Sequence, residues 1–135
     1  MNERREVPET DRHVLVCYDG PEVREKLSSL LRESGFEVDC ASDGALALEK
    51  IRERDYTLVL AAVRMGGATA LGLVRQARNL RPSTAIVLVV GKSEVNEAIT
   101  AIRHGAYDYF HEPLNPEDVL HTVRRAVEKR RLERV

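Results

Sequence analysis

Five short apolar runs alternate with longer amphipathic segments along this chain of 135 residues. The runs are HVLVCY at 13–18, FEVDC at 36–40, YTLVLA at 56–61, TAIVLVV at 84–90 and YDYF at 107–110. The other segments have apolar residues at helical spacing, at 21–34, 45–54, 68–80, 94–104 and from 116 to the end. This alternation is typical of a parallel sheet with helices on both faces. We therefore predict an α/β fold with a doubly wound, five-stranded parallel sheet flanked by five helices.

The composition is that of a single folded domain. Hydrophobic residues make up 43% of the chain and charged residues 32%, and the length suits one core. With 21 basic and 22 acidic side chains, the net charge of -1 draws the chain to neither nucleic acid nor membrane. Residues 1–12 are polar and have no apolar stretch typical of a signal peptide. We predict a cytoplasmic protein in which residues 1–12 form a flexible lead.

The carboxyl ends of the predicted strands are where an open parallel sheet holds ligands and catalytic groups. The third strand ends at Ala62, whose methyl group cannot ionise, bind a metal or act as a nucleophile. The neighbouring strand ends supply no nucleophile–base pair, no set of metal ligands and no nucleotide-binding glycine loop. We predict no enzymatic activity, no metal and no cofactor.

Three stretches of the sequence carry a resemblance to a known family. They are VLVCYDGPEVREKLSSLLRESGFEVDCASDGALALEKI, YTLVLAAVRMGG and AIVLVVGKSEVNEAITAIRHGAYDYFHEPL. Together they resemble the receiver domain of response regulators over residues 13–130. The resemblance implies the strand order 2-1-3-4-5. It also implies a family activity, the transfer of a phosphoryl group from a histidine kinase to an aspartate that ends the third strand.

The resemblance assigns the family's functional positions to residues of a different chemistry. The acidic pair that holds magnesium falls on Tyr18 and Asp19, so only the second acid is present. The phosphorylated aspartate falls on Ala62, and the hydroxyl residue that contacts the phosphoryl group falls on Val90. The lysine that pairs with the phosphoryl charge falls on Glu112. This departure predicts a pseudo-receiver whose signalling does not depend on phosphorylation at the usual position.

Two other positions keep the family pattern. Pro113 matches the family's proline, which implies a cis peptide bond after Glu112. Tyr109 matches the switch aromatic of the fifth strand. We predict that the face made by the fourth helix, fifth strand and fifth helix binds a protein partner or a second copy of the chain. The candidate contacts on that face are Ile99, Ile102, Arg103 and Tyr109.

The predicted site also raises the question of what fills it. Two carboxylates at one edge, Asp19 and Glu112, repel each other, so we predict that Arg64 or Lys92 lies between them. Tyr18 is predicted to fill the space of the missing acid. An alternative hypothesis keeps a switch, in which Ser93, Thr69 or Tyr18 takes a covalent or small-molecule signal and controls a downstream output domain.

The final segment, VLHTVRRAVEKRRLERV, has apolar residues on one side and arginines on the other. It is either a solvated last helix or, from residue 131 onward, the start of a linker helix that signals or dimerises. The ending AVEKRRLER resembles the junction after the receiver in enhancer-binding transcription activators of the nitrogen-regulator type. That implies a longer chain with an ATPase and a DNA-binding domain. Glu128, Glu133 and the lack of a recognition helix argue against direct nucleic-acid binding by this segment.

Overall fold

The central sheet has five parallel strands in the order β2-β1-β3-β6-β7. The computed structural model describes residues 7, 9–66 and 68–133. The strands are β1 (His13–Cys17), β2 (Glu37–Ala41), β3 (Leu58–Ala62), β6 (Ala85–Val90) and β7 (Asp108–His111). Counted along the chain, these five strands have the predicted order 2-1-3-4-5. The predicted fold class is confirmed.

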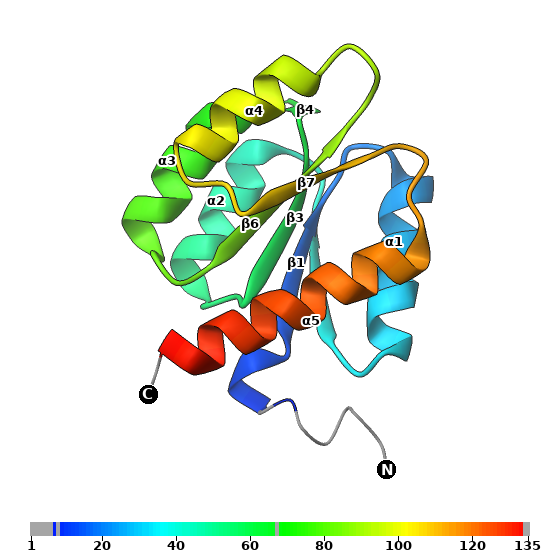
Figure 1. The fold of residues 1–135 in the computed structure, drawn as a ribbon, viewed down its shortest axis with the longest axis vertical. Coiled ribbons are helices and arrows are strands. Elements are labelled where there is room, and N and C mark those ends of the chain that lie inside the picture. The colour runs from blue at the N-terminus through cyan, green and yellow to red at the C-terminus, as the bar shows by residue number, and fades with distance from the viewer. Residues whose placement is uncertain (1–6, 8, 67, 134–135) are drawn as a thin grey trace.

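Helices cover both faces of the sheet (Figure 1). They are α1 (Pro21–Glu33), α2 (Gly44–Glu53), α3 (Ala70–Leu80), α4 (Val95–Arg103) and α5 (Pro116–Glu133). The buried side chains form two clusters, one between the sheet and α2, α3 and α4, the other between the sheet and α1 and α5. A doubly wound sheet has this three-layer arrangement.

The position of β3 in the middle of the sheet explains why its apolar residues do not alternate with polar ones. Leu58, Leu60 and Ala62 belong to the cluster under α1 and α5. Val59 and Ala61 belong to the cluster on the opposite face. Successive side chains of a strand point to opposite faces, and here both faces are covered. The strand is therefore buried along its whole length.

The start of the third helix differs from the prediction. Arg64–Met65 (β4) and Ala68–Thr69 (β5) pair as a short antiparallel ladder, and α3 begins at Ala70 instead of residue 68. Thr69 is the N-cap, since its hydroxyl accepts a hydrogen bond from the Gly72 N–H at 3.0 Å. The carbonyl of Gly66 accepts from the Gly44 N–H at 2.8 Å, which joins this loop to the start of α2.

The carboxyl end of the predicted lead forms a short helix that contacts α5. Glu9–Asp11 is a 3₁₀ helix, and the Asp11 side chain is fully buried. Its Oδ1 lies 3.7 Å from Nε of Arg130 on α5. Residues 9–11 therefore contact α5, residues 1–6 and 8 lie outside the described residues, and the flexible lead stays a prediction.

Helix α5 runs without interruption past residue 131, where a linker was predicted to start, and residues 134–135 lie outside the described range. None of the described helices has the length and hydropathy needed to cross a membrane.

Candidate functional site

The carboxyl ends of four neighbouring strands meet at one edge of the sheet (Figure 1). Ala62 ends β3 and Val90 ends β6, and both side chains are buried. Tyr18 follows β1, and its N–H donates to the Ala41 carbonyl at 3.0 Å. Glu112 follows β7, and its N–H donates to the Val90 carbonyl at 2.9 Å. Backbone pairing thus brings residues from distant parts of the sequence to one place.

A tyrosine–carboxylate hydrogen bond crosses this edge. The hydroxyl of Tyr18 donates to Oε2 of Glu112. The Tyr18 side chain is 8% exposed and belongs to the same cluster as Ala62. Sequence reasoning placed Tyr18 at this edge as a space-filling residue but did not foresee its carboxylate partner.

The environment of Tyr18 keeps its hydroxyl protonated. Burial raises the pKa of Tyr18 most, and the hydrogen bond to Glu112 raises it further. The negative charges of Glu112, Asp19 and Glu94 act in the same direction. Since the ordinary tyrosine pKa is about 10, the hydroxyl is a neutral donor at pH 7.

Arg64 does not lie between Asp19 and Glu112, so the prediction is wrong for this residue. Its Nη2 donates to Oε1 of Glu97 at 2.7 Å, and its Nε lies 3.4 Å from Oε2 of Glu94. Arg64 belongs to β4, and its guanidinium meets the N-cap residue and the first turn of α4. For Lys92 likewise, no ion pair to either acid occurs among the described residues.

Glu94 is a residue that sequence reasoning missed. Its Oε1 accepts a hydrogen bond from the Gly91 N–H at 2.7 Å. A side chain at position 91 would place its Cβ 3.4 Å from that Glu94 oxygen and 3.6 Å from Oε1 of Glu112. Glu94 is the N-cap residue of α4 and Gly91 lies before the helix, so this bond is not a capping box and had no such signal in the sequence.

A cation does reach this edge, from α1. Nη1 of Arg24 donates to the carbonyl of Tyr18 at 2.7 Å and to that of Asp19 at 3.3 Å. It contacts backbone oxygens instead of the predicted carboxylates. Within the part of the chain that the structure describes, no three histidine, cysteine or acidic side chains are arranged to hold a metal ion. The donor set at this edge therefore does not fit magnesium, which requires several hard oxygen ligands in octahedral geometry.

A groove of about 760 Å³ lies beside the edge, between α1 and the loop that follows β7. Its apolar lining includes Leu27, Leu30 and Val119. Lys92 and Pro113 also line it, and the predicted cis peptide bond between Glu112 and Pro113 is confirmed.

A family model described as "Response regulator receiver domain" matches residues 14–124 of this chain. The chain belongs to that family. The predicted resemblance is thereby confirmed.

Several proteins are similar to this receiver domain. It is 34% identical over 101 residues to the transcriptional regulatory protein ZraR of Escherichia coli O157:H7. The aligned residues make up 75% of this chain and 23% of that protein. It is 33% identical over 120 residues to the C4-dicarboxylate transport transcriptional regulatory protein DctD of Pseudomonas aeruginosa, over 88% of this chain and 26% of the relative. The chain therefore spans about a quarter of the length of these regulators.

Solved structures agree with the fold of this receiver domain. NtrX from Brucella abortus superposes with a TM-score of 0.84 at 28% identity, over 92% of this chain and 28% of that one. A CheY-like receiver domain from Methanospirillum hungatei superposes with a TM-score of 0.86 at 23% identity, over 91% of this chain and 98% of that one. At that identity the second match concerns the fold alone.

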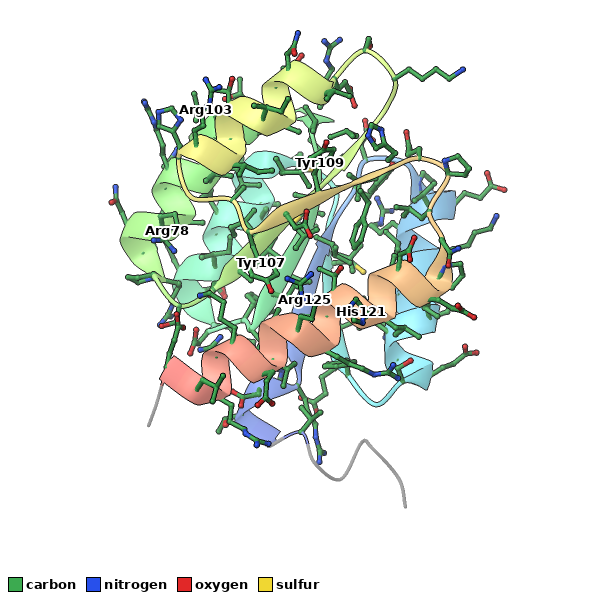
Figure 2. The ribbon with its side chains drawn as sticks, in the orientation of Figure 1. Arg78, Arg103, Tyr107, Tyr109, His121 and Arg125 are labelled. Atoms are coloured by element: carbon green, nitrogen blue, oxygen red, sulfur yellow. The ribbon has the colours of Figure 1, made fainter. Side chains whose placement is uncertain are left out.

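The predicted interaction residues lie on α4 and β7 of the receiver domain. Ile99, Ile102 and Arg103 belong to α4, and Tyr109 belongs to β7. Tyr109 and Ile102 pack against the same core cluster. The ring of Tyr109 also meets that of His111 edge-on, with centroids 5.4 Å apart. Figure 2 shows Arg103 at the end of α4 and Tyr109 on β7.

The hydroxyls of the alternative hypothesis occupy two loops at the same end of the receiver domain. The Thr69 hydroxyl caps α3, as described above. Ser93 is exposed in the loop between β6 and α4.

Proposed function

We propose that this receiver domain is a protein-interaction module of a two-component-type regulator and that its activity is independent of phosphorylation at the end of β3. The observation that carries the proposal is the Tyr18–Glu112 hydrogen bond beside Ala62. A neutral hydroxyl and a carboxylate occupy the edge at which a phosphoryl group would have to arrive.

The chemistry of the edge supports this proposal. Ala62 offers no nucleophile to form an acyl phosphate, and Val90 has no hydroxyl to bind a phosphoryl oxygen. Glu112 carries negative charge at the place where the resemblance implies a lysine. Because three separate parts of the reaction are missing, one substitution does not restore it.

The ion pairs at the start of α4 suggest how the domain acts instead. Arg64, in the loop after β3, holds Glu94 and Glu97 without any phosphoryl group. The loop and α4 are thus linked in the unmodified protein. We infer that α4, β7 and α5 present one fixed surface, the α4–β7–α5 face, to a partner, a second copy or an output domain in a longer chain.

Acetyl phosphate and magnesium provide the test. Incubation followed by intact-mass measurement is expected to show no phosphoryl adduct on the native protein. The variant Ala62→Asp is also expected to remain unmodified, because Val90 and Glu112 are unchanged. A stoichiometric adduct on the native protein would overturn the proposal. Robust labelling of Ala62→Asp would show that the other positions matter less than we infer.

A second candidate function is control by a substitute group or a small molecule, favoured by the groove beside the edge. Gly91 and Lys92 line this groove and immediately precede Ser93. An adduct in the mass experiment that mapped to Ser93, Thr69 or Tyr18 would support this function over the first.

A further inference from the structure

We propose that the groove between α1 and the loop after β7 binds a small apolar amine whose ammonium group pairs with Glu112. This inference rests on the second candidate function, control by a small molecule, and it adds the chemical class of that molecule. Three features of the groove carry it, which are its apolar walls, the fixed position of the Glu112 carboxylate and the negative charge around that carboxylate.

The walls of the groove are apolar and come from two helices. Helix α1 supplies Val23, Leu27 and Leu30, which are three or four residues apart and therefore lie on one side of the helix. Helix α5 supplies Pro116 and Val119. The two helices cover the same face of the sheet (Figure 1). The volume of about 760 Å³ falls within the range of about 300–1,000 Å³ that is typical of small-molecule sites.

The carboxylate of Glu112 lies where the groove meets the carboxyl edge of the sheet. Its Oε2 accepts the hydrogen bond from the hydroxyl of Tyr18, a residue that is only 8% exposed. Its Oε1 lies beside Gly91, since a Cβ at position 91 would be 3.6 Å from it, and both residues line the groove. One carboxylate oxygen is therefore held by a buried donor, while the other faces the lining of the groove. A carboxylate held in this way loses less side-chain freedom when it binds a ligand.

The charges around this carboxylate are negative. Burial raises the pKa of Tyr18 most, and the charges of Glu112, Asp19 and Glu94 each raise it further. These charges act against a second negative group beside the Tyr18 hydroxyl, and they favour a positive one. A ligand with an ammonium group therefore suits this end of the groove better than a ligand with a carboxylate or a phosphate.

Two lysines also line the groove, and they favour the opposite charge in a ligand. Lys26 also lines a shallow depression on α1 together with Glu22, Glu25 and Glu33, so three carboxylates offset its charge. Lys92 is exposed in the loop after β6, and no ion pair to a described residue holds its side chain. A mobile ammonium group loses more side-chain freedom on binding than a fixed carboxylate does. We therefore expect the carboxylate to decide which charge the groove prefers.

Gly91 connects the groove to α4. Its N–H donates to Oε1 of Glu94 at 2.7 Å, and Glu94 is the N-cap residue of α4. Glu94 in turn pairs with Arg64 in the loop after β3. An amine bound at Glu112 would thus lie next to the loop that holds the start of α4, which gives a bound ligand a route to that helix.

An NMR titration of the isotopically labelled native protein at pH 7 tests the inference. The three probes are phenylbutylamine, phenylbutanol and phenylbutyrate, which share one apolar body and differ in charge. We expect the amine to shift the backbone amides of Leu27, Gly91 and Val119. It should bind at least about tenfold more tightly than phenylbutyrate, with phenylbutanol between them, because a charge-assisted hydrogen bond forms with the amine alone.

Two variants and a control assign the charge preference to Glu112. Glu112→Gln keeps a carbonyl oxygen for the Tyr18 hydroxyl but removes the charge, so it should weaken amine binding at least about fivefold and leave phenylbutanol binding unchanged. Lys92→Gln should not weaken amine binding. Glu49→Gln is the matched control, because Glu49 is an exposed carboxylate on α2, which covers the opposite face of the sheet. It should leave the affinity for all three probes unchanged.

Three results would overturn the inference. They are no shift of the groove amides by the amine up to about 10 mM, binding of phenylbutyrate at least as tight as that of the amine, and amine affinity unaffected by Glu112→Gln. Phenylbutyrate binding that Lys92→Gln abolishes would assign the groove to an anion, which keeps the second candidate function and rejects the amine. All of these results leave phosphorylation independence in place. A phosphoryl adduct on the native protein in the mass experiment would remove that proposal whatever the probes do.

Discussion

The two ends of the sheet both hold a network of charged side chains, but the two networks differ in burial. At the amino ends of the strands, the side chain of Arg130 is only 5% exposed and pairs with Asp11 and Asp55. Its Nη1 also donates to the Tyr56 carbonyl at 2.6 Å. At the carboxyl ends, the side chain of Arg64 is 64% exposed and pairs with Glu94 and Glu97.

This difference in burial predicts that the Arg130 network stabilises the domain and that the Arg64 network positions α4. A buried charge that loses its partner cannot be rescued by water, so the Arg130 network is expected to contribute to the free energy of unfolding. An exposed pair exchanges its partner for water with little change in free energy. The Arg64 network can therefore orient α4 while contributing little to the stability of the domain.

Arg130→Met gives the largest expected effect. It removes the buried guanidinium that pairs with Asp11 and Asp55, and it removes one of the two donors to the Tyr56 carbonyl, the other being the Thr84 hydroxyl. We expect the free energy of unfolding to fall by about 3–5 kcal/mol, measured by urea denaturation at pH 7. Asp55→Asn is a milder variant, since the Asp55 side chain is 48% exposed, and it should show a smaller fall.

Arg131→Met is the matched control for the buried arginine. The side chain of Arg131 is 53% exposed, and its Nη2 lies 3.9 Å from Oε1 of Glu128. We therefore expect the free energy of unfolding to change by about 0.5 kcal/mol or less. Equal effects of the Arg130 and Arg131 variants would mean that burial does not distinguish these charges.

The contrast between the two ends of the sheet could be predicted only in part from the sequence. The alternating runs predicted the sheet, its order and the edge at which Tyr18, Ala62 and Glu112 meet, because periodicity and strand order are local or topological properties. The Tyr18–Glu112 bond joins residues 94 positions apart, and Arg130 and Asp55 are 75 apart. Such pairs depend on tertiary geometry and leave no periodic signal.

The partners of Arg64 and of Asp11 were not predicted for a similar reason. Nothing in the sequence pattern indicated that β4 and β5 would pair or that Arg64 would meet the start of α4. The polarity of residues 1–12 suggested a flexible lead. The buried partner of Asp11 is Arg130, which lies near the opposite end of the chain and leaves no local signal.

Raising the pH tests both ends together through their tyrosines. Burial raises the pKa of Tyr18 and of Tyr56, and hydrogen bonds to Glu112 and Asp39 raise these values further. The folded state therefore retains protons that the unfolded state releases above its tyrosine pKa of about 10. Stability is complete below this pH and falls above it, by about 1 kcal/mol per tyrosine between pH 10 and 11.

Urea denaturation at pH 9, 10 and 11 measures this loss. Tyr18→Phe and Tyr56→Phe should each reduce the fall by about 1 kcal/mol. The buried Cys17 thiol, whose pKa burial also raises, contributes the same loss to all three proteins. An unchanged fall in either variant would show that the tyrosine at that end is not the titrating group.

At pH 7, Tyr18→Phe isolates the hydrogen bond at the carboxyl edge. The ring remains, and Glu112 loses its donor but stays accessible to water, so we expect a loss of about 0.5–1 kcal/mol. Tyr109→Phe is the control, because its hydroxyl forms no hydrogen bond with a residue that the structure describes. A fall of about 3 kcal/mol in the free energy of unfolding for Tyr18→Phe would mean that this hydrogen bond stabilises the domain as much as the Arg130 network does.

Arg64→Gln should have the smallest effect on stability and the more informative effect on α4. Arg64, whose side chain is 64% exposed, loses its ion pairs with Glu94 and Glu97, which lowers the free energy of unfolding by about 0.5 kcal/mol or less, and by less at high salt. Hydrogen exchange of the first α4 amides should nevertheless become faster, because the loop after β3 no longer holds Glu94 and Glu97. Lys129→Gln removes an exposed pair of the same 2.7 Å length within α5 and should leave α4 exchange unchanged. If Arg64→Gln leaves hydrogen exchange at α4 unchanged, the Arg64 network does not position the helix, and the two ends of the sheet differ in burial without differing in role.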